Sequence, residues 1–211
     1  MNYPKTIYLL TVLAAGGLLF SACSNLKPVA DTSRFFALAP LSLATRDASV
    51  PEKGLVVGVG RVAIPDYLQS KRIVLHKGNS EMDYSETLYW AERLDKGIQR
   101  VLVANLSLLL DSNNLILSAW RRSEVQAEVY VSVERFETDE QGRMVLEARW
   151  RITGPGGEKT LLSTVSKIVK RGPSFATDPD GAVSTLSEAV VELSREISSA
   201  LRTQAFFQGH L

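Results

Sequence analysis

The apolar positions along the chain switch between two periods, and these periods predict the order of its elements. Residues 125–134 carry valine or alanine at alternate positions, which is typical of a strand with one buried face. Residues 146–152 repeat this period after the polar turn 138–143, with Arg149 and Arg151 facing outward. A glycine-rich turn then leads into residues 161–169. We expect these three strands to form an antiparallel meander.

Two segments show the spacing of three and four residues that is typical of a helix laid on a sheet. The first runs from about Ser85, a good N-cap, to residue 109, before a polar stop at 111–114. Asn105 lies within its apolar stripe, and we expect its amide to reach a loop carbonyl rather than a ligand. The second segment has its stripe at Val183, Leu186, Val190, Leu193, Ile197 and Leu201.

Four further strands are predicted in the first half of the chain, at residues 34–38, 55–64, 72–76 and 81–84. The second of them is apolar on both faces except at Arg61, which predicts a central strand covered on both sides, ended by Pro65. The order of elements predicts a single α+β domain over residues 34–204. We expect a mainly antiparallel sheet with two amphipathic helices packed on it, followed by a tail at 205–211. Phe206 and Phe207 in this tail would fray or pack on the core, or contact a partner.

The first 22 residues have the composition of a signal peptide. Lys5 supplies a positive start, and residues 7–20 form an apolar run without a charge. A spanning helix needs about 20 apolar residues, and this run is shorter. It ends in small residues before Cys23, so we expect cleavage between Ala22 and Cys23.

Residues 18–23 (LLFSAC) resemble the lipobox of bacterial lipoproteins, in which the cysteine is acylated. Phe20 departs from the usual leucine but keeps the position apolar. The sequence holds one cysteine, so an internal disulfide cannot form, and acylation of Cys23 accounts for that residue. Residues 23–33 would then be a lipidated tether. By the same resemblance, Ser24 permits sorting to the periplasmic face of the outer membrane.

The charge of the mature chain excludes one class of partner. Cleavage removes Lys5 and no acid, which leaves 23 basic residues against the 23 acidic residues of the sequence. A nucleic-acid binder concentrates lysine and arginine, so we expect no nucleic-acid partner. Attachment to the membrane would come from the lipid rather than from charge.

Residues that could carry catalysis are sparse. The two histidines, His76 and His210, lie in a predicted strand and near the end, and no clustered ligands accompany them. Gly58 and Gly60 lie inside a strand pattern, where glycine favours close packing of a helix on the sheet over nucleotide binding. The carboxylates of Glu134 and Glu137 have the spacing of an exposed strand edge, without sign of burial. We therefore predict no enzyme, no cofactor and no metal site.

An ordered set of short motifs points to a family. Residues 64–68 (IPDYL) precede residues 72–74 (RIV), and residues 90–94 (WAERL) follow. Further pieces of the set are FFAL at 35–38, VSVERFE at 131–137 and LEARW at 146–150. Together they resemble the PqiC family, also called ABC-type transport auxiliary lipoproteins. Arg93 departs from the proline that is frequent there, so the helix would begin earlier or run without a kink.

The resemblance implies a function that composition does not reveal. It implies a non-enzymatic outer-membrane lipoprotein of an MCE-type intermembrane lipid transport system, which docks the periplasmic conduit. Its partners would be a PqiB-like MCE-domain protein and an inner-membrane component, and the chain would self-associate into a ring. The alternatives are a lipid carrier with an apolar cavity, an assembly lipoprotein of another envelope machine, and a hydrolase with a buried nucleophile near His76.

Five residues within these motifs are candidate partner contacts: Pro65, Tyr67, Leu68, Trp90 and Glu92. The first three would otherwise form a strand-ending turn that packs on the core. Trp90, expected at a helix start, is either a core anchor or an interface hot spot, because indole supplies a large area and one donor. Glu92 would otherwise cap its own helix.

Overall fold

The computed structural model describes residues 30–42, 56–78, 80–110, 120–121 and 124–208. One compact unit comprises Ser33–Leu211. The predicted lipobox, with Ala22, Cys23 and Ser24, lies outside the described residues, as does His210.

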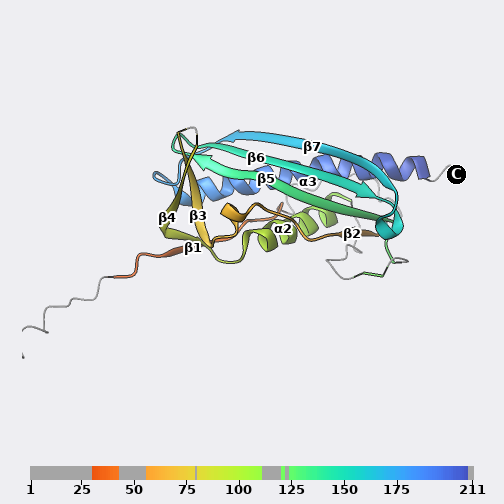
Figure 1. The fold of residues 1–211 in the computed structure, drawn as a ribbon, viewed down its shortest axis with the longest axis horizontal. Coiled ribbons are helices and arrows are strands. Elements are labelled where there is room, and N and C mark those ends of the chain that lie inside the picture. The colour runs from red at the N-terminus through yellow and green to blue at the C-terminus, as the bar shows by residue number, and fades with distance from the viewer. Residues whose placement is uncertain (1–29, 43–55, 79, 111–119, 122–123, 209–211) are drawn as a thin grey trace, which may run out of the picture. The chain divides into compact units, whose positions relative to one another are not determined.

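Seven strands form one sheet in the order β1-β4-β3-β5-β6-β7, and β2 pairs with β5 (Figure 1). Their bounds are Arg34–Phe36 (β1), Val57–Val59 (β2), Arg72–Lys77 (β3), Glu81–Trp90 (β4), Ala127–Asp139 (β5), Arg143–Thr153 (β6) and Thr160–Arg171 (β7). The helices are α2 (Leu94–Leu109) and α3 (Pro179–Gln208), with single 3-10 turns at η3 (Asp66–Leu68) and η4 (Pro155–Gly157). The α+β class is confirmed.

The sheet is mixed, so the prediction of a mainly antiparallel sheet is wrong. The meander β5-β6-β7 and the hairpin β3-β4 are antiparallel, as predicted. The pairs β1-β4, β2-β5 and β3-β5 are parallel. In each parallel pair the two strands are separated by other elements along the chain. No tight turn sets their direction, so packing decides it.

One face of the meander is covered by α3, which runs along β5, β6 and β7 (Figure 1). Leu146 and Ile152 of β6 and Leu193 and Ile197 of α3 are fully buried. Each such side chain contributes about 1.5–3 kcal/mol relative to an exposed one. The helix α2 contacts α3 and β2, and the guanidinium of Arg202 on α3 donates to the carbonyl of Leu109 at the end of α2.

The second helix extends further than its apolar stripe predicts. It continues to Gln208, so the expected tail 205–211 begins as helix. No glycine or proline interrupts the sequence between Gly181 and Gly209, and nothing in this stretch breaks the backbone hydrogen bonding.

The helix expected from Ser85 is wrong over its first turns, because residues 85–90 belong to β4 and α2 begins at Leu94. The Ser85 hydroxyl accepts a hydrogen bond from the Leu88 amide at 3.0 Å, as an N-cap would. Here it shapes a bulge, where the register between β3 and β4 shifts. Arg93 has φ −60°, the value that proline favours, and it directly precedes the helix. The helix therefore begins later than expected, at Leu94, and not earlier.

The long central strand expected at 55–64 is also wrong. Only Val57–Val59 form β2, followed by an isolated bridge from Ala63 to Ser132 on β5. A Cβ on Gly58 would lie 2.6 Å from the Trp120 ring, and one on Gly60 would lie 2.8 Å from the Tyr130 ring. The glycines therefore leave room for two aromatic side chains, and α2 also packs on this segment, where the Gln99 side chain donates to the Gly60 carbonyl at 3.0 Å.

Asn105 is fully buried between the two helices and the segment after β1. Its side-chain oxygen accepts from the Leu41 amide at 2.7 Å, and its nitrogen donates to the Ser194 hydroxyl at 3.0 Å. The partner in the loop is thus an amide, and not the carbonyl that we expected.

We predict that Asn105→Ala lowers the free energy of unfolding by about 1–3 kcal/mol, because it removes the acceptor of the half-buried Leu41 amide and the buried bond to Ser194. Urea denaturation of the purified protein measures this. Ser107→Ala is the matched control, since the Ser107 hydroxyl donates only within its own helix, to Val103. Equal midpoints for the two variants would contradict the role given to Asn105.

Candidate partner-binding surface

The turn after Pro65 is confirmed as η3, and its residues Tyr67 and Leu68 differ in how far they are buried. Leu68 is buried in the core, whereas Pro65 and Tyr67 are half-buried. The Tyr84 hydroxyl on β4 donates to the Tyr67 carbonyl at 3.2 Å. Of the three candidate contacts on this turn, Pro65 and Tyr67 keep surface that a partner could reach.

Tyr67 closes a small polar cluster on β5. Its hydroxyl donates to the Glu134 carbonyl at 3.3 Å and approaches the Glu137 carboxylate at 3.5 Å. Glu137 is only 3% exposed and forms an ion pair with Arg135. Burial raises the pKa of Tyr67 to about 12, and the negative charge of Glu137 adds to this shift.

The expectation that Glu134 and Glu137 are both exposed is therefore wrong for Glu137. Glu134 is exposed and accepts from Arg149 of β6 at 3.2 Å. A bulge between Val133 and Arg135 shifts the alternation by one residue, so Glu137 lies on the same face of the sheet as Glu134, where Tyr67 of η3 covers it. Each carboxylate has its own arginine, and the two do not form an acid pair.

Trp90 and Glu92 lie away from this cluster. Trp90 ends β4 and is 5% exposed, so the structure places it in the core and not at a helix start. Glu92 does not cap α2; its carboxylate accepts from Arg100 at 2.6 Å. Arg100 also donates to the Leu38 carbonyl at 2.9 Å, which ties the helix to the segment after β1.

The face of β5 and β6 opposite α3 exposes Ser132, Arg149 and Arg151, and we call it the outer face. A segment that follows β2 runs along its edge. The Gly60 amide donates to Val129 at 2.9 Å, and the Val133 amide donates to Ala63 at 2.9 Å. These bonds place Arg61 beside the outward side chains of β5, although the sequence pattern predicted it inside a covered strand.

A groove of about 260 Å³ lies on the outer face. Its polar lining consists of Arg61, Tyr130, Ser132, Arg149, Arg151 and Ser163, which come from three strands and the segment after β2. The alternation of β6 had placed Arg149 and Arg151 outward. It gave no sign that Arg61 would join them.

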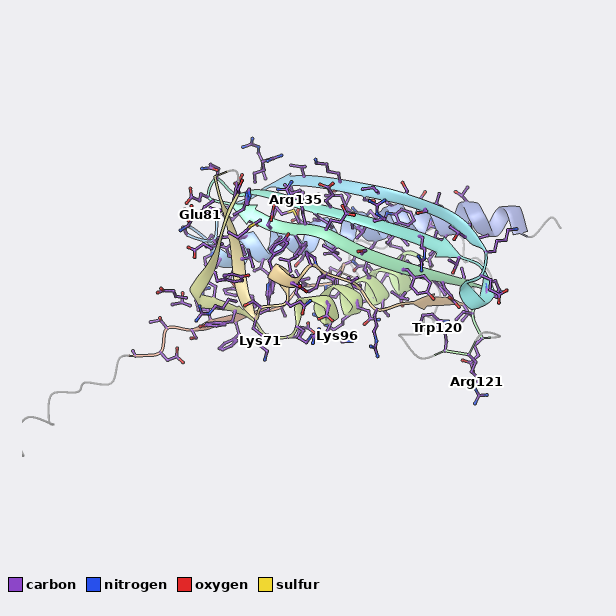
Figure 2. The ribbon with its side chains drawn as sticks, viewed as in Figure 1. Lys71, Glu81, Lys96, Trp120, Arg121 and Arg135 are labelled. Atoms are coloured by element: carbon purple, nitrogen blue, oxygen red, sulfur yellow. The ribbon has the colours of Figure 1, made fainter. Side chains whose placement is uncertain are left out.

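Glu128 lies under one end of the groove and is 3% exposed, although its position predicted a wet face. It accepts from the Trp120 indole at 3.0 Å and from the Tyr130 hydroxyl at 2.7 Å. Figure 2 shows Trp120 beside β2. The bond to Glu128 raises the pKa of Tyr130, with burial as a second cause. Two neutral donors thus satisfy this buried carboxylate.

Other chemistry is sparse in the part of the chain that the structure describes. His76 lies half-buried in β3. No group of three or more histidine, cysteine, aspartate or glutamate side chains gathers there as a metal site would require. Over the same residues, no helix has the length and apolar character needed to cross a membrane.

Comparison with known proteins decides the family. The family model of the ABC-type transport auxiliary lipoprotein component matches residues 36–198, which is most of the chain. The chain belongs to this family. Members similar to it include the intermembrane transport lipoprotein PqiC of Escherichia coli K12 and that of Shigella flexneri. Each is 22% identical over 149 residues, which cover 71% of this chain and 75% of the relative.

Solved structures share the fold of this auxiliary lipoprotein. A protein from Xanthomonas campestris superposes with a TM-score of 0.67 at 14% identity, over 84% of this chain and all of the other. An uncharacterized protein gives 0.66 at 20% identity, over 80% and 98%. The family match and the two relatives confirm the resemblance to the PqiC family, which is a family of auxiliary transport lipoproteins and not of enzymes.

The raised pKa of Tyr67 predicts a dependence of stability on pH. The folded pKa of about 12 exceeds the ordinary value of 10.0, so the folded state holds this proton more tightly. The resulting stability is present below pH 10 and is lost as pH rises toward 12. In Tyr67→Phe, the free energy of unfolding should fall less steeply across this range.

Denaturant titrations at a series of pH values measure this slope. Tyr89→Phe serves as the control, because the Tyr89 hydroxyl donates to a carbonyl of its own strand, that of Glu86. If Tyr67→Phe and the unmodified protein show the same slope above pH 10, the Tyr67 cluster does not stabilise the fold in this way.

Proposed function

We propose that this protein is an outer-membrane lipoprotein of an MCE-type intermembrane lipid transport system, where it docks the periplasmic conduit. The observation that carries the proposal is the family match over residues 36–198, together with similarity to proteins named intermembrane transport lipoproteins. The docked partner is a PqiB-like MCE-domain protein, which in turn meets an inner-membrane component. Self-association into a ring stays a prediction.

The protein acts by position. Acyl chains on Cys23 hold it at the periplasmic face, and residues 23–33 set its reach. Ten peptide steps from Cys23 to Ser33 span at most about 35 Å. Anchoring within this distance raises the local concentration of the domain near a partner that arrives at the same membrane, so weak contacts suffice for docking.

The outer face, with the η3 edge beside it, is the docking surface that we favour. Of the helices that the structure describes, α3 packs on the opposite face and α2 contacts α3 and β2. The outer face mixes apolar and polar side chains, as partner-binding surfaces do. Val165 and Val169 of β7 are nearly half exposed there. Tyr84, which supports the Tyr67 turn, is also exposed. Leu68 and Trp90 would support this surface from the core instead of touching the partner.

Photocrosslinking in intact envelopes tests the docking surface. We expect a crosslinkable residue at Val165 or Tyr67 to capture the MCE-domain protein, because both lie on the proposed surface. The matched control is Glu188, an exposed position on α3, whose products should lack that protein. Capture of another envelope machine from Val165, with no MCE-domain protein, would overturn the docking proposal.

Replacement of the acylated residue tests the anchor. Cys23→Ser removes the thiol that carries the lipid, so the protein should leave the membrane fraction or stay uncleaved, as mass spectrometry and fractionation would show. Ser24→Asp is the companion variant, because it keeps the anchor and should shift the protein toward the inner membrane. A cleaved Cys23→Ser protein that remains in the outer membrane would disprove the anchor.

A further inference from the structure

The groove on the outer face concentrates positive charge that its surroundings do not neutralise. Among the described residues, Arg61 and Arg151 take part in no ion pair, and both are exposed. Arg149 shares one hydrogen bond of 3.2 Å with Glu134. Glu128 is occupied by Trp120 and Tyr130, and Glu147, two residues before Arg149, forms an ion pair with Lys167. Arg61 and Arg151 are therefore left without a carboxylate partner in the described part of the chain, and both can bind an anion.

The sheet geometry directs these groups to one place. Arg149 and Arg151 are two residues apart on β6, so both point outward, about 7 Å apart along the strand. Tyr130 pairs with Arg151, which in turn pairs with Ser163 of β7. Ser132 pairs with Arg149 in the next row. The short serines leave room between the arginines and present hydroxyl groups.

Tyr130 organises the site. Its hydroxyl donates to Glu128, which fixes the ring, and the guanidinium of Arg151 lies 4.8 Å from the ring centroid. Stacking holds the planar guanidinium over the ring and leaves its N–H groups in the plane free. Gly60 packs against the same ring, and Arg61 follows it in the chain. One ring thus positions both unpaired arginines.

The chemistry of this lining favours a phosphate ester. Arginine binds phosphate through two parallel N–H donors, and serine hydroxyl groups complete such sites. Pockets for drug-sized ligands measure about 300–1,000 Å³. At about 260 Å³ the groove is below that range, so it can admit a headgroup but not acyl chains.

We propose that the outer-face groove binds the phosphate of a phospholipid headgroup. The anion site rests on the geometry, while its assignment to a lipid rests on the proposed function in lipid transport. The acyl chains would stay outside the groove, in the membrane or in the conduit of the partner. The protein would then orient a headgroup at the point of docking without enclosing the lipid.

Calorimetry on the full lipoprotein in a non-ionic detergent tests this site, with inorganic phosphate and monomeric dihexanoyl phosphatidylglycerol as probes. We expect the lipid probe to bind more tightly than phosphate. Arg61→Gln and Arg151→Gln should each weaken its binding about tenfold, because each removes a charge-assisted contact. Arg72→Gln, an exposed arginine on β3, is the matched control and should leave binding unchanged.

The possible outcomes separate the sources of the anion. Equal affinity for phosphate and for the lipid probe would overturn the headgroup assignment, and lack of binding by either probe would overturn the site. The double variant Arg61→Gln/Arg151→Gln is also placed in the crosslinking assay. Loss of lipid binding by this variant supports the proposal, whether or not capture falls, because the groove lies on the proposed docking surface. If the unmodified protein binds no lipid and the double variant no longer captures the MCE-domain protein, the groove binds an acidic segment of the partner instead.

Discussion

The burial of one face of the meander beneath α3 is the constraint on which the remaining structure depends. Leu186, Val190, Leu193 and Ile197 close this interface with little or no exposure. A polar chain locks the two layers together, since the Trp150 indole donates to the Ser166 hydroxyl at 2.7 Å and that hydroxyl donates to Glu196 on α3. Because α3 spans all three strands, the opposite face is left for other contacts.

The segment after β2 uses that open face. It joins the edge of β5 by backbone hydrogen bonds from Gly60 to Ala63, then turns at Pro65 into η3. Arg61 and Tyr67 both come from this short stretch. Arg61 reaches the groove near Tyr130, and Tyr67 covers the buried Glu137 farther along β5. The connector between two strands therefore supplies a charged side chain for binding and a ring that shields a carboxylate.

Local patterns predicted the meander because its three strands are joined by short turns and each buries alternate residues. They failed at β4, where Ser85 and the acid after it satisfy the rules for a helix start. The Ser85 hydroxyl does accept the amides that an N-cap would accept, but β4 is held as a strand by β3 on one side and β1 on the other. The β1 partner of residues 88–90 lies 54 residues earlier in the chain, at 34–36, so a local pattern carries no sign of it.

The sequence by itself determined the class of the fold, the meander, the presence of both helices and the family, since periodicity, turn residues and short motifs are local properties. Only the tertiary structure decided that β1 pairs in parallel with β4 and β2 with β5. It also decided the burial of Glu128 and Glu137 and brought Arg61 next to Arg149 and Arg151. Each of these depends on contacts between segments distant in the chain. The stability of a paired strand or a buried carboxylate comes from the partner that packing places beside it, and the residue alone does not specify that partner.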